Sequence, residues 1–348
     1  MIEHSGIGVY IQSIYHLVIK ETPNVNCILL IDDKINYSNY FNIDDYNCVS
    51  ISSPIYSLRE QIEIPFKLGS DIDLYWSPHY IFPFLLRAKF LLTIHDIYHF
   101  IDKSLYKIFR RFYAKIFFYL IKKMSIHTIC VSEFTKRELL DKFNMDTNII
   151  DVVYNGIDNF DKTEPEIDYK LNNIILYVGN SKKHKNVEIL IKAYKKINQR
   201  TDFKLYLIGN FNFKILSKNI RKSIDNDSNI VHLPSMKRDK LFSYYNKSRL
   251  LVLPSIYEGF GFPPLEAVLC GCPALLSDIP VLKEINSDGA YYFRNNNIDS
   301  LVGKINLLLE NHTITDEVLR KGQINLQKYS WEKSASKTAA IIKNQLSL

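Results

Sequence analysis

Short apolar runs recur along the first half of the chain at intervals typical of an alternating α/β domain. Each run is rich in Leu, Ile and Val, as strands of a parallel sheet are when both faces are covered. Residues 11–20, before the first run, have apolar positions at helical spacing, and a second helix is predicted over residues 133–143, between two later runs. The predicted strands are residues 27–31, 74–76, 90–94, 128–131 and 149–153.

The same rhythm restarts in the second half of the chain. Residues 161–170 are polar and charged and contain a proline, so they form the best candidate linker. We therefore predict an N-terminal domain over residues 1–160, a C-terminal domain over residues 171–328 and a last helix over residues 329–348. The strands predicted in the second domain are residues 174–178, 204–208, 230–233, 249–253 and 274–276.

Composition fits a folded protein of this size. The chain has 348 residues, 47% of them hydrophobic and 23% charged, which is enough for two cores. Its five cysteines are scattered and odd in number, which predicts reduced thiols in a cytoplasmic protein. No signal peptide or membrane-spanning stretch is expected. The net charge of +7 suits an acidic substrate, an anionic membrane surface or nucleic acid equally.

The richest chemistry lies in residues 255–266, Ser-Ile-Tyr-Glu-Gly-Phe-Gly-Phe-Pro-Pro-Leu-Glu, which follow a predicted strand. Gly259 and Gly261 let the backbone pass close to a ligand, and the two prolines suit the start of a helix, whose end favours an anion. Glu258 and Glu266 flank this phosphate site. They are suited to accept hydrogen bonds from hydroxyl groups, although a solvated loop acid and a helix-start acid would have the same pattern.

With the following Cys-Gly-Cys-Pro, this stretch closely resembles the nucleotide-sugar site of the group-1 family of retaining glycosyltransferases. The resemblance implies the GT-B fold, an α/β architecture of two Rossmann-like domains facing across a cleft, with the last helix crossing back to the first domain. It implies that Glu266 holds the ribose hydroxyls and Glu258 those of the donor sugar. The donor diphosphate would meet the backbone of Gly259, Phe260, Gly261 and Phe262.

Two further elements of the family bear on the diphosphate. Lys185 with the following Asn matches an Arg-Lys-Asn element, but His184 stands where arginine is expected and lacks its bidentate fork. Gly6 and Gly8 are predicted to form a tight turn before a helix, as in the Gly-Ile-Gly-x-Tyr element of the family. That element normally follows a first strand, which is missing here. Either the sequence begins after it, or residues 27–32 serve as the first strand.

His95 and Asp96 follow a predicted strand and resemble the Thr-x-His-Asp element of the mannosyltransferase-like branch. The resemblance implies that His95 reaches the donor sugar, with Asp96 as its orienting partner, although a lone histidine after a strand is more often structural. Ser132 is predicted to cap the helix over residues 133–143, and both it and His79 are weaker candidates for the acceptor side.

Residues 103–123 combine basic and aromatic side chains on one predicted helix. Leu105, Phe109, Phe112, Ile116 and Leu120 share a face at helical spacing. Such a helix suits the headgroup layer of an anionic membrane, and it equally suits an ordinary solvated surface. No nucleic-acid recognition module accompanies it, so nucleic acid is not an expected partner.

The resemblance implies a retaining hexosyltransferase, and we expect it to be metal-independent and to need no cofactor. His95, Glu258 and Lys185 are its candidate catalytic residues. It would move a sugar, mannose-like by resemblance, from a GDP- or UDP-linked donor to a lipid-linked oligosaccharide of the bacterial cell surface, an O-antigen of lipopolysaccharide or a capsule, at the inner face of the cytoplasmic membrane. Two alternatives stay open: an epimerase or phosphorylase of the same fold, and a catalytically silent subunit that binds a membrane or a partner glycosyltransferase.

Overall fold

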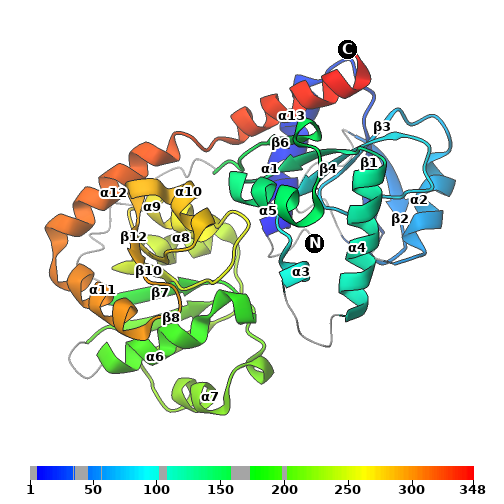
Figure 1. Ribbon diagram of the computed structural model, residues 1–348. Coiled ribbons are helices and arrows are strands. Elements are labelled where there is room, and N and C mark those ends of the chain that lie inside the picture. The colour runs from blue at the N-terminus through cyan, green and yellow to red at the C-terminus, as the bar shows by residue number, and fades with distance from the viewer. Residues whose placement is uncertain are drawn as a thin grey trace. The chain divides into compact units, whose positions relative to one another are not determined.

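The computed structural model describes residues 6–33, 35, 46–55, 57–101, 108–157, 173–197 and 202–348. The chain divides into two compact units (Figure 1). The first comprises residues 1–156 together with 330–348, and the second comprises residues 157–329. The predicted linker, residues 161–170, lies outside the described residues.

The second unit is built on one parallel sheet of six strands in the order β12-β11-β10-β7-β8-β9. All residues of β10 and β11 are buried, because helices cover both faces of the sheet. Figure 1 shows α9 and α10 on one side of the sheet and α6 on the other. The strands are β7 (Ile174–Val178), β8 (Lys204–Ile208), β9 (Ile230–Leu233), β10 (Leu250–Leu253), β11 (Ala274–Ser277) and β12 (Tyr291–Phe293). The helices are α6 (Val187–Ile197), α7 (Lys218–Asp225), α8 (Arg238–Asn246), α9 (Phe262–Leu269), α10 (Pro280–Asn286), α11 (Ile298–Glu310) and α12 (His312–Leu326).

The first unit contains two parallel sheets among its described residues. One pairs β1 with β2, and the other has the order β3-β4-β5-β6. The strands are β1 (Ile28–Asp32), β2 (Asn47–Ile51), β3 (Leu74–Ser77), β4 (Lys89–Ile94), β5 (His127–Cys130) and β6 (Ile150–Val152). The helices are α1 (Gly6–Glu21), α2 (Glu60–Leu68), α3 (Tyr98–Ile101), α4 (Ile108–Lys123), α5 (Glu133–Phe143) and α13 (Trp331–Leu346).

The last helix belongs to the first unit although the second unit precedes it in sequence. Helix α13 packs along α1, as Figure 1 shows for its red and blue ribbons. Its Trp331 ring lies 6.1 Å from that of Tyr10, and Ser334 donates a hydrogen bond to the carbonyl of Tyr154. These contacts fix the carboxyl-terminal end of the described chain onto the first unit.

Two expectations for the first unit are wrong in detail. Gly6 and Gly8 lie inside the first turn of α1, and no separate turn precedes the helix at these glycines. The helix starts early because Gly8, Tyr10, Ile14 and Val18 all face the core at helical spacing, so burial offsets the low helix propensity of glycine.

The buried face of α4 also differs from the predicted one. The sequence pattern predicts an apolar face that includes Phe112 and Ile116, but their exposed fractions are 65% and 40%. The face that packs into the core consists of Ala114, Phe117, Phe118 and Ile121. Phe118 stacks on Phe143 of α5 with ring centroids 4.4 Å apart, and this contact selects which of two apolar stripes is buried. Residues 102–107 and the side chains of residues 108–111 lie outside the described part.

No helix in the described part of the chain is both long enough and apolar enough to cross a bilayer.

Candidate donor-binding site

The turn between β10 and α9 carries the two glutamates singled out by the sequence. Gly261 caps α9 with φ of 90°, a conformation that side chains with a Cβ rarely adopt. A Cβ at this position would also lie 2.9 Å from Cδ2 of Leu282. The glycine therefore sets the direction of the turn and lets Phe262 begin the helix, followed by two prolines.

Glu258 is held at the start of this turn by an ion pair. The ammonium of Lys185 donates to both carboxylate oxygens, at 2.7 Å to Oε1 and 2.8 Å to Oε2. The hydroxyl of Ser255 donates to Oε1 at 2.6 Å. Because the Glu258 residue is only 8% exposed, these donors compensate for the loss of water around its charge.

Glu266 is held one turn and a half into α9 by two side chains of α8. The phenol of Tyr245 donates to Oε2 at 2.9 Å, and the guanidinium of Arg238 donates to Oε1 at 3.3 Å. Burial, with the neighbouring Glu266 carboxylate, raises the pKa of Tyr245 well above its ordinary value, so the phenol keeps its proton and remains a donor. Glu266 is 6% exposed. It is therefore a preoriented acceptor inside the unit.

The loops after β7 and β10 contact each other, because the amide of Ile256 donates to the carbonyl of His184 at 2.8 Å. A third strand end joins them: the hydroxyl of Ser277, the last residue of β11, donates to the carbonyl of Ser255. Lys185 ends a short 3-10 turn, after which Asn186 adopts a left-handed conformation with φ of 49°. This geometry turns the chain into α6 and carries Lys185 to Glu258.

Among the predicted residues of the second unit, the structure brings Lys185 and Glu258 into direct contact and places Glu266 on the helix that follows. His184 contacts the turn through its backbone carbonyl. Phe260 is buried, and its ring lies 5.7 Å from that of Tyr329 and 5.2 Å from that of Phe262, so its side chain has a packing role.

Sequence reasoning missed three residues of this cluster, namely Arg238, Tyr245 and Ser255. Arg238 and Tyr245 are seven positions apart on α8, so they share one face of the helix. That spacing was a readable signal. The spacing of residues along α8 does not reveal that this face packs against α9, because that contact forms only in the folded unit.

In the first unit, His95 lies at the carboxyl end of β4. Its Nε2 lies 3.1 Å from the carbonyl of Pro78 and therefore donates to it, which leaves Nδ1 as the acceptor. Burial lowers the pKa of His95 to about 4, although this hydrogen bond opposes the shift. The Asp96 carboxylate accepts from the amide of Tyr98 at 2.9 Å. The Pro78 carbonyl and the Tyr10 ring, 4.9 Å away, thus contact the His95 ring, and a role of Asp96 in orienting it stays a prediction.

His79 and Ser132 have clear structural contacts. Nδ1 of His79 accepts from the amide of Ile81 at 3.0 Å, and burial, with the neighbouring His95, lowers the pKa of His79 to about 3. Ser132 caps α5 by accepting from the amide of Thr135 at 3.1 Å, which confirms its predicted role as N-cap. Roles of these residues on the acceptor side, and of Gly6 and Gly8 in phosphate binding, stay predictions.

Within the described residues, no group of three or more His, Cys, Asp and Glu side chains is arranged to hold a metal ion.

Two protein-family models match the chain. Residues 160–325 match "Glycosyl transferases group 1" and residues 38–159 match "Glycosyltransferase Family 4". The matches follow each other along the sequence, so together they span most of both units.

Curated relatives agree with these families. The chain is 29% identical over 310 residues to the O-antigen chain mannosyltransferase RfbU of Salmonella typhimurium, covering 83% of each protein. It is 24% identical to an uncharacterized glycosyltransferase, MJ1607, of Methanocaldococcus jannaschii, covering 97% of this chain and 94% of the relative. An O-antigen chain mannosyltransferase B of Escherichia coli is 26% identical over 47% of this chain.

Solved structures share the fold over almost the whole chain. Anabaena HepE, solved in complex with UDP and glucose, has a TM-score of 0.77 at 16% identity and covers 97% of this chain and 96% of its own. WaaG, a glycosyltransferase involved in lipopolysaccharide biosynthesis, has a TM-score of 0.76 at 12% identity with the same coverage. The chain has two parallel α/β units and a glycine turn flanked by two buried glutamates, as these matches imply. It therefore belongs to the group-1 glycosyltransferases of the GT-B fold, in the bacterial mannosyltransferase branch.

Proposed function

We propose that the chain transfers a hexose, mannose-like, from a GDP- or UDP-linked donor to a growing lipid-linked polysaccharide, with retention at the anomeric carbon. The observation that carries the proposal is the pair of buried, hydrogen-bonded glutamates on either side of the Gly259–Gly261 turn. The mannosyltransferase names of the curated relatives support the sugar, and their O-antigen chains support the acceptor.

The contacts suggest how the donor is held. The amino-terminal end of α9 favours negative charge, so a diphosphate fits there. Pro263 and Pro264 have no backbone N–H, so hydrogen bonds to the phosphates would come from the backbone of the glycine turn before the helix. Lys185 is already positioned at Glu258. A phosphate oxygen that draws the ammonium toward itself would leave the Glu258 oxygens to accept from sugar hydroxyls.

Glu266 is suited to the other end of the donor. Ribose hydroxyls are hydrogen-bond donors, and the Glu266 carboxylate is fixed by Tyr245 while Arg238 makes the longer contact. When the glycosidic bond breaks, negative charge grows on the leaving diphosphate, and the Lys185 ammonium with the positive end of α9 would stabilise it. Because the fold holds these groups beside the diphosphate, they are more effective than water. On this proposal neither a metal ion nor a cofactor takes part, and activity persists in EDTA.

Nucleotide binding tests the donor site. We expect one of GDP, UDP and ADP to bind in isothermal titration calorimetry, and Glu266→Gln to weaken it by about tenfold or more, which corresponds to about 1.4 kcal/mol. Glu310→Gln changes an exposed residue at the end of α11, so it is the matched control and should bind as the parent chain does. If a folded protein binds none of the three, the proposal fails and the silent-subunit alternative leads.

Product analysis tests the reaction. With the bound nucleotide's sugar as donor and a lipid-linked oligosaccharide as acceptor, NMR of the product should show the same anomeric configuration as the donor. Release of a changed sugar without acceptor would indicate an epimerase, and a requirement for inorganic phosphate would indicate a phosphorylase.

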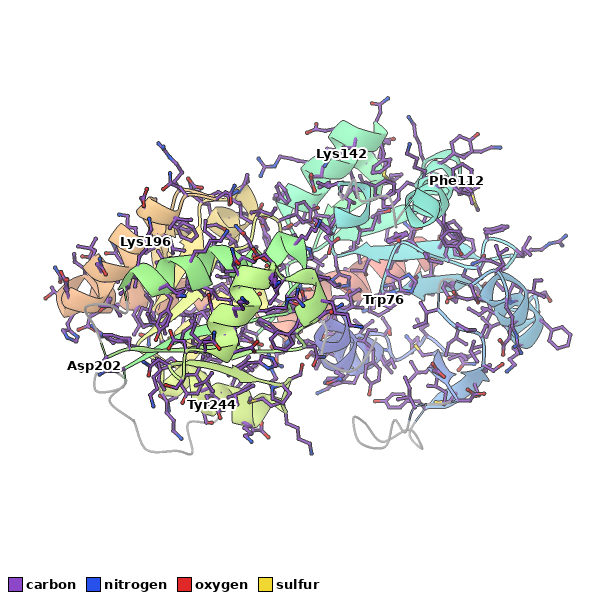
Figure 2. All side chains as sticks on the ribbon, turned by 90° about the horizontal axis from the view of Figure 1, so that it is seen from below. Trp76, Phe112, Lys142, Lys196, Asp202 and Tyr244 are labelled. Carbon is purple, nitrogen blue, oxygen red and sulfur yellow. The ribbon has the colours of Figure 1, made fainter. Side chains whose placement is uncertain are left out.

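We also propose that the first unit binds the inner face of the cytoplasmic membrane. Large apolar side chains are exposed on two neighbouring helices: Leu58, Ile62 and Phe66 at α2, and Phe112, Ile116 and Tyr119 on α4. Phe84 links these helices, because its amide donates to Gln61 of α2 and its ring contacts Phe117 of α4. Figure 2 labels Phe112 on α4. Exposed cations on α4 suit anionic headgroups: Lys115, Lys122 and Lys123.

A further inference from the structure

Two side chains from different loops hold the carboxylate of Glu258. Lys185 follows β7 and Ser255 follows β10, and these strands are neighbours in the sheet of the second unit (Figure 1). The Oε1 atom accepts hydrogen bonds from both side chains, from the Lys185 ammonium at 2.7 Å and from the Ser255 hydroxyl at 2.6 Å. The Oε2 atom accepts from Lys185 at 2.8 Å. The two carboxylate oxygens are therefore held in different ways.

The two donors also differ in how freely they can move. Lys185 carries its ammonium on a flexible four-carbon stem, and 19% of this side chain is exposed. Ser255 is fully buried and lies three residues before Glu258 in the same turn. A diphosphate can therefore draw the ammonium away from Glu258 while the turn stays in place. The short Ser255 side chain stays with the turn.

Ser255 is fixed through its backbone. The peptide group that joins it to Ile256 makes a hydrogen bond at each end. Its carbonyl accepts from the hydroxyl of Ser277, and its amide donates to the carbonyl of His184 at 2.8 Å. Ser277 is fully buried at the end of β11. The ends of three strands of one sheet, β7, β10 and β11, thus set the position of Ser255.

This arrangement determines what remains at Glu258 once the ammonium has moved to a phosphate. Oε1 keeps the hydrogen bond from Ser255, whose length of 2.6 Å is that of a charge-assisted O–H···O⁻ contact. Oε2 loses its lysine donor and is ready to accept from a sugar hydroxyl. The last torsion of a glutamate side chain is broad, so a hydrogen bond to one oxygen also fixes the direction of the other.

We propose that Ser255 is a positioning residue for recognition of the sugar. In the donor complex it holds Oε1 of Glu258, so that Oε2 accepts from a hydroxyl of the transferred hexose, and Ser277 supports it by fixing its backbone. This inference rests on the proposed function and divides the donor into two halves. The diphosphate depends on Lys185, whereas the sugar depends on Ser255 acting through Glu258.

Calorimetry with two kinds of ligand tests this assignment. The parent chain is titrated with GDP, UDP and ADP and with GDP-mannose, UDP-glucose and ADP-glucose, and the pair that binds is used for the variants. We expect Ser255→Ala to weaken the sugar nucleotide by about tenfold, or about 1.4 kcal/mol, and the diphosphate by less than about threefold. Water can replace the lost donor while the place of the sugar is empty, but the sugar displaces that water.

Matched variants separate this effect from a general effect on folding. Ser248→Ala removes another fully buried hydroxyl of the same unit, which donates to the carbonyl of Tyr244 at 2.6 Å. It should leave the ratio of the two affinities unchanged. Ser277→Ala should reproduce the selective loss at a smaller size, about threefold. Thermal melts check that each variant is folded.

A double-mutant cycle shows whether Ser255 acts through Glu258. In a Glu258→Ala background, Ser255→Ala should cause no further loss of affinity for the sugar nucleotide, because the group that it positions is gone. An additive loss would overturn the proposal, as would equal losses for the diphosphate and the sugar nucleotide, or no loss in Ser255→Ala. In those cases the parent chain still binds nucleotide, so the proposed function stands. A folded parent chain that binds none of the six ligands would overturn both.

Discussion

The two units differ in how much of their structure is complete within themselves. The second has one continuous sheet, and its two buried glutamates have side-chain donors from the same unit. The first has its strands in two separate sheets, a cavity between them and large apolar side chains exposed on α2 and α4. A charged ligand site needs donors fixed in advance, whereas an apolar surface or edge gains its partner by burial. On our proposals, the second unit therefore binds a small polar ligand, and the first unit binds an apolar surface.

The largest effect should come from the cation of the second unit. Lys185→Met removes the ammonium next to Glu258 and should lower the rate of sugar transfer by about 10²–10³-fold, the usual loss for one preorganised group that stabilises developing charge. Lys192→Met, on the exposed side of α6, is the matched control. Turnover with radiolabelled donor measures both, and equal rates for the two variants would remove Lys185 from the mechanism.

The next effect concerns the turn itself. Gly261→Ala imposes a Cβ at φ of 90° and close to Leu282, so we expect the second unit to lose about 1–3 kcal/mol in its free energy of unfolding, together with nucleotide affinity. Gly271→Ala is an instructive comparison, because φ there is 81° but no atom lies within 4 Å of the added Cβ. Urea unfolding of both separates backbone strain from the clash. If both substitutions lower the free energy of unfolding by the same amount, the contact with Leu282 does not contribute to the loss.

A smaller effect should distinguish the first unit by its response to pH. The pKa values of His79 and His95 are lowered to about 3 and about 4, below the ordinary 6.5. The unfolded chain therefore binds more protons than the folded chain in this range, and the stability contributed by the two neutral rings is lost as pH falls from about 6.5 toward 4. Thermal melts across this range should show a weaker pH dependence in His95→Gln. An unchanged dependence would contradict the burial-based origin of the shift.

The smallest effect on folding, and a selective one on binding, should come from the exposed rings of the first unit. Phe66→Ser and Phe112→Ser remove side chains that are 86% and 65% exposed, so stability should change by less than about 0.5 kcal/mol. The fraction of protein that sediments with phosphatidylglycerol vesicles should nevertheless fall in both variants. Leu307→Ser, on α11 of the second unit, serves as control. Equal vesicle binding by all three variants and the parent chain would argue against these helices as a membrane surface.

The sequence alone specified the strands of the second unit closely. The predicted ranges 174–178, 204–208 and 230–233 are those of β7, β8 and β9. Buried parallel strands are short apolar runs with clear ends, so their pattern is unambiguous. It also singled out Glu258, Glu266 and Lys185 as candidates, because glycine turns, prolines and charged residues at strand ends leave a local signature. It missed β2 and β12, since Asn47–Ile51 is partly exposed and β12 has only three residues.

Tertiary structure decided the contacts between distant segments. The pairing of Lys185 with Glu258, and of Tyr245 and Arg238 with Glu266, depends on how loops and helices pack around one sheet, which no single segment encodes. The same is true of α4, where two apolar stripes compete and packing against Phe143 selects one. Local periodicity determines where strands and helices form, because it depends on neighbouring residues, whereas the choice of partner depends on the free energy of the whole packed unit.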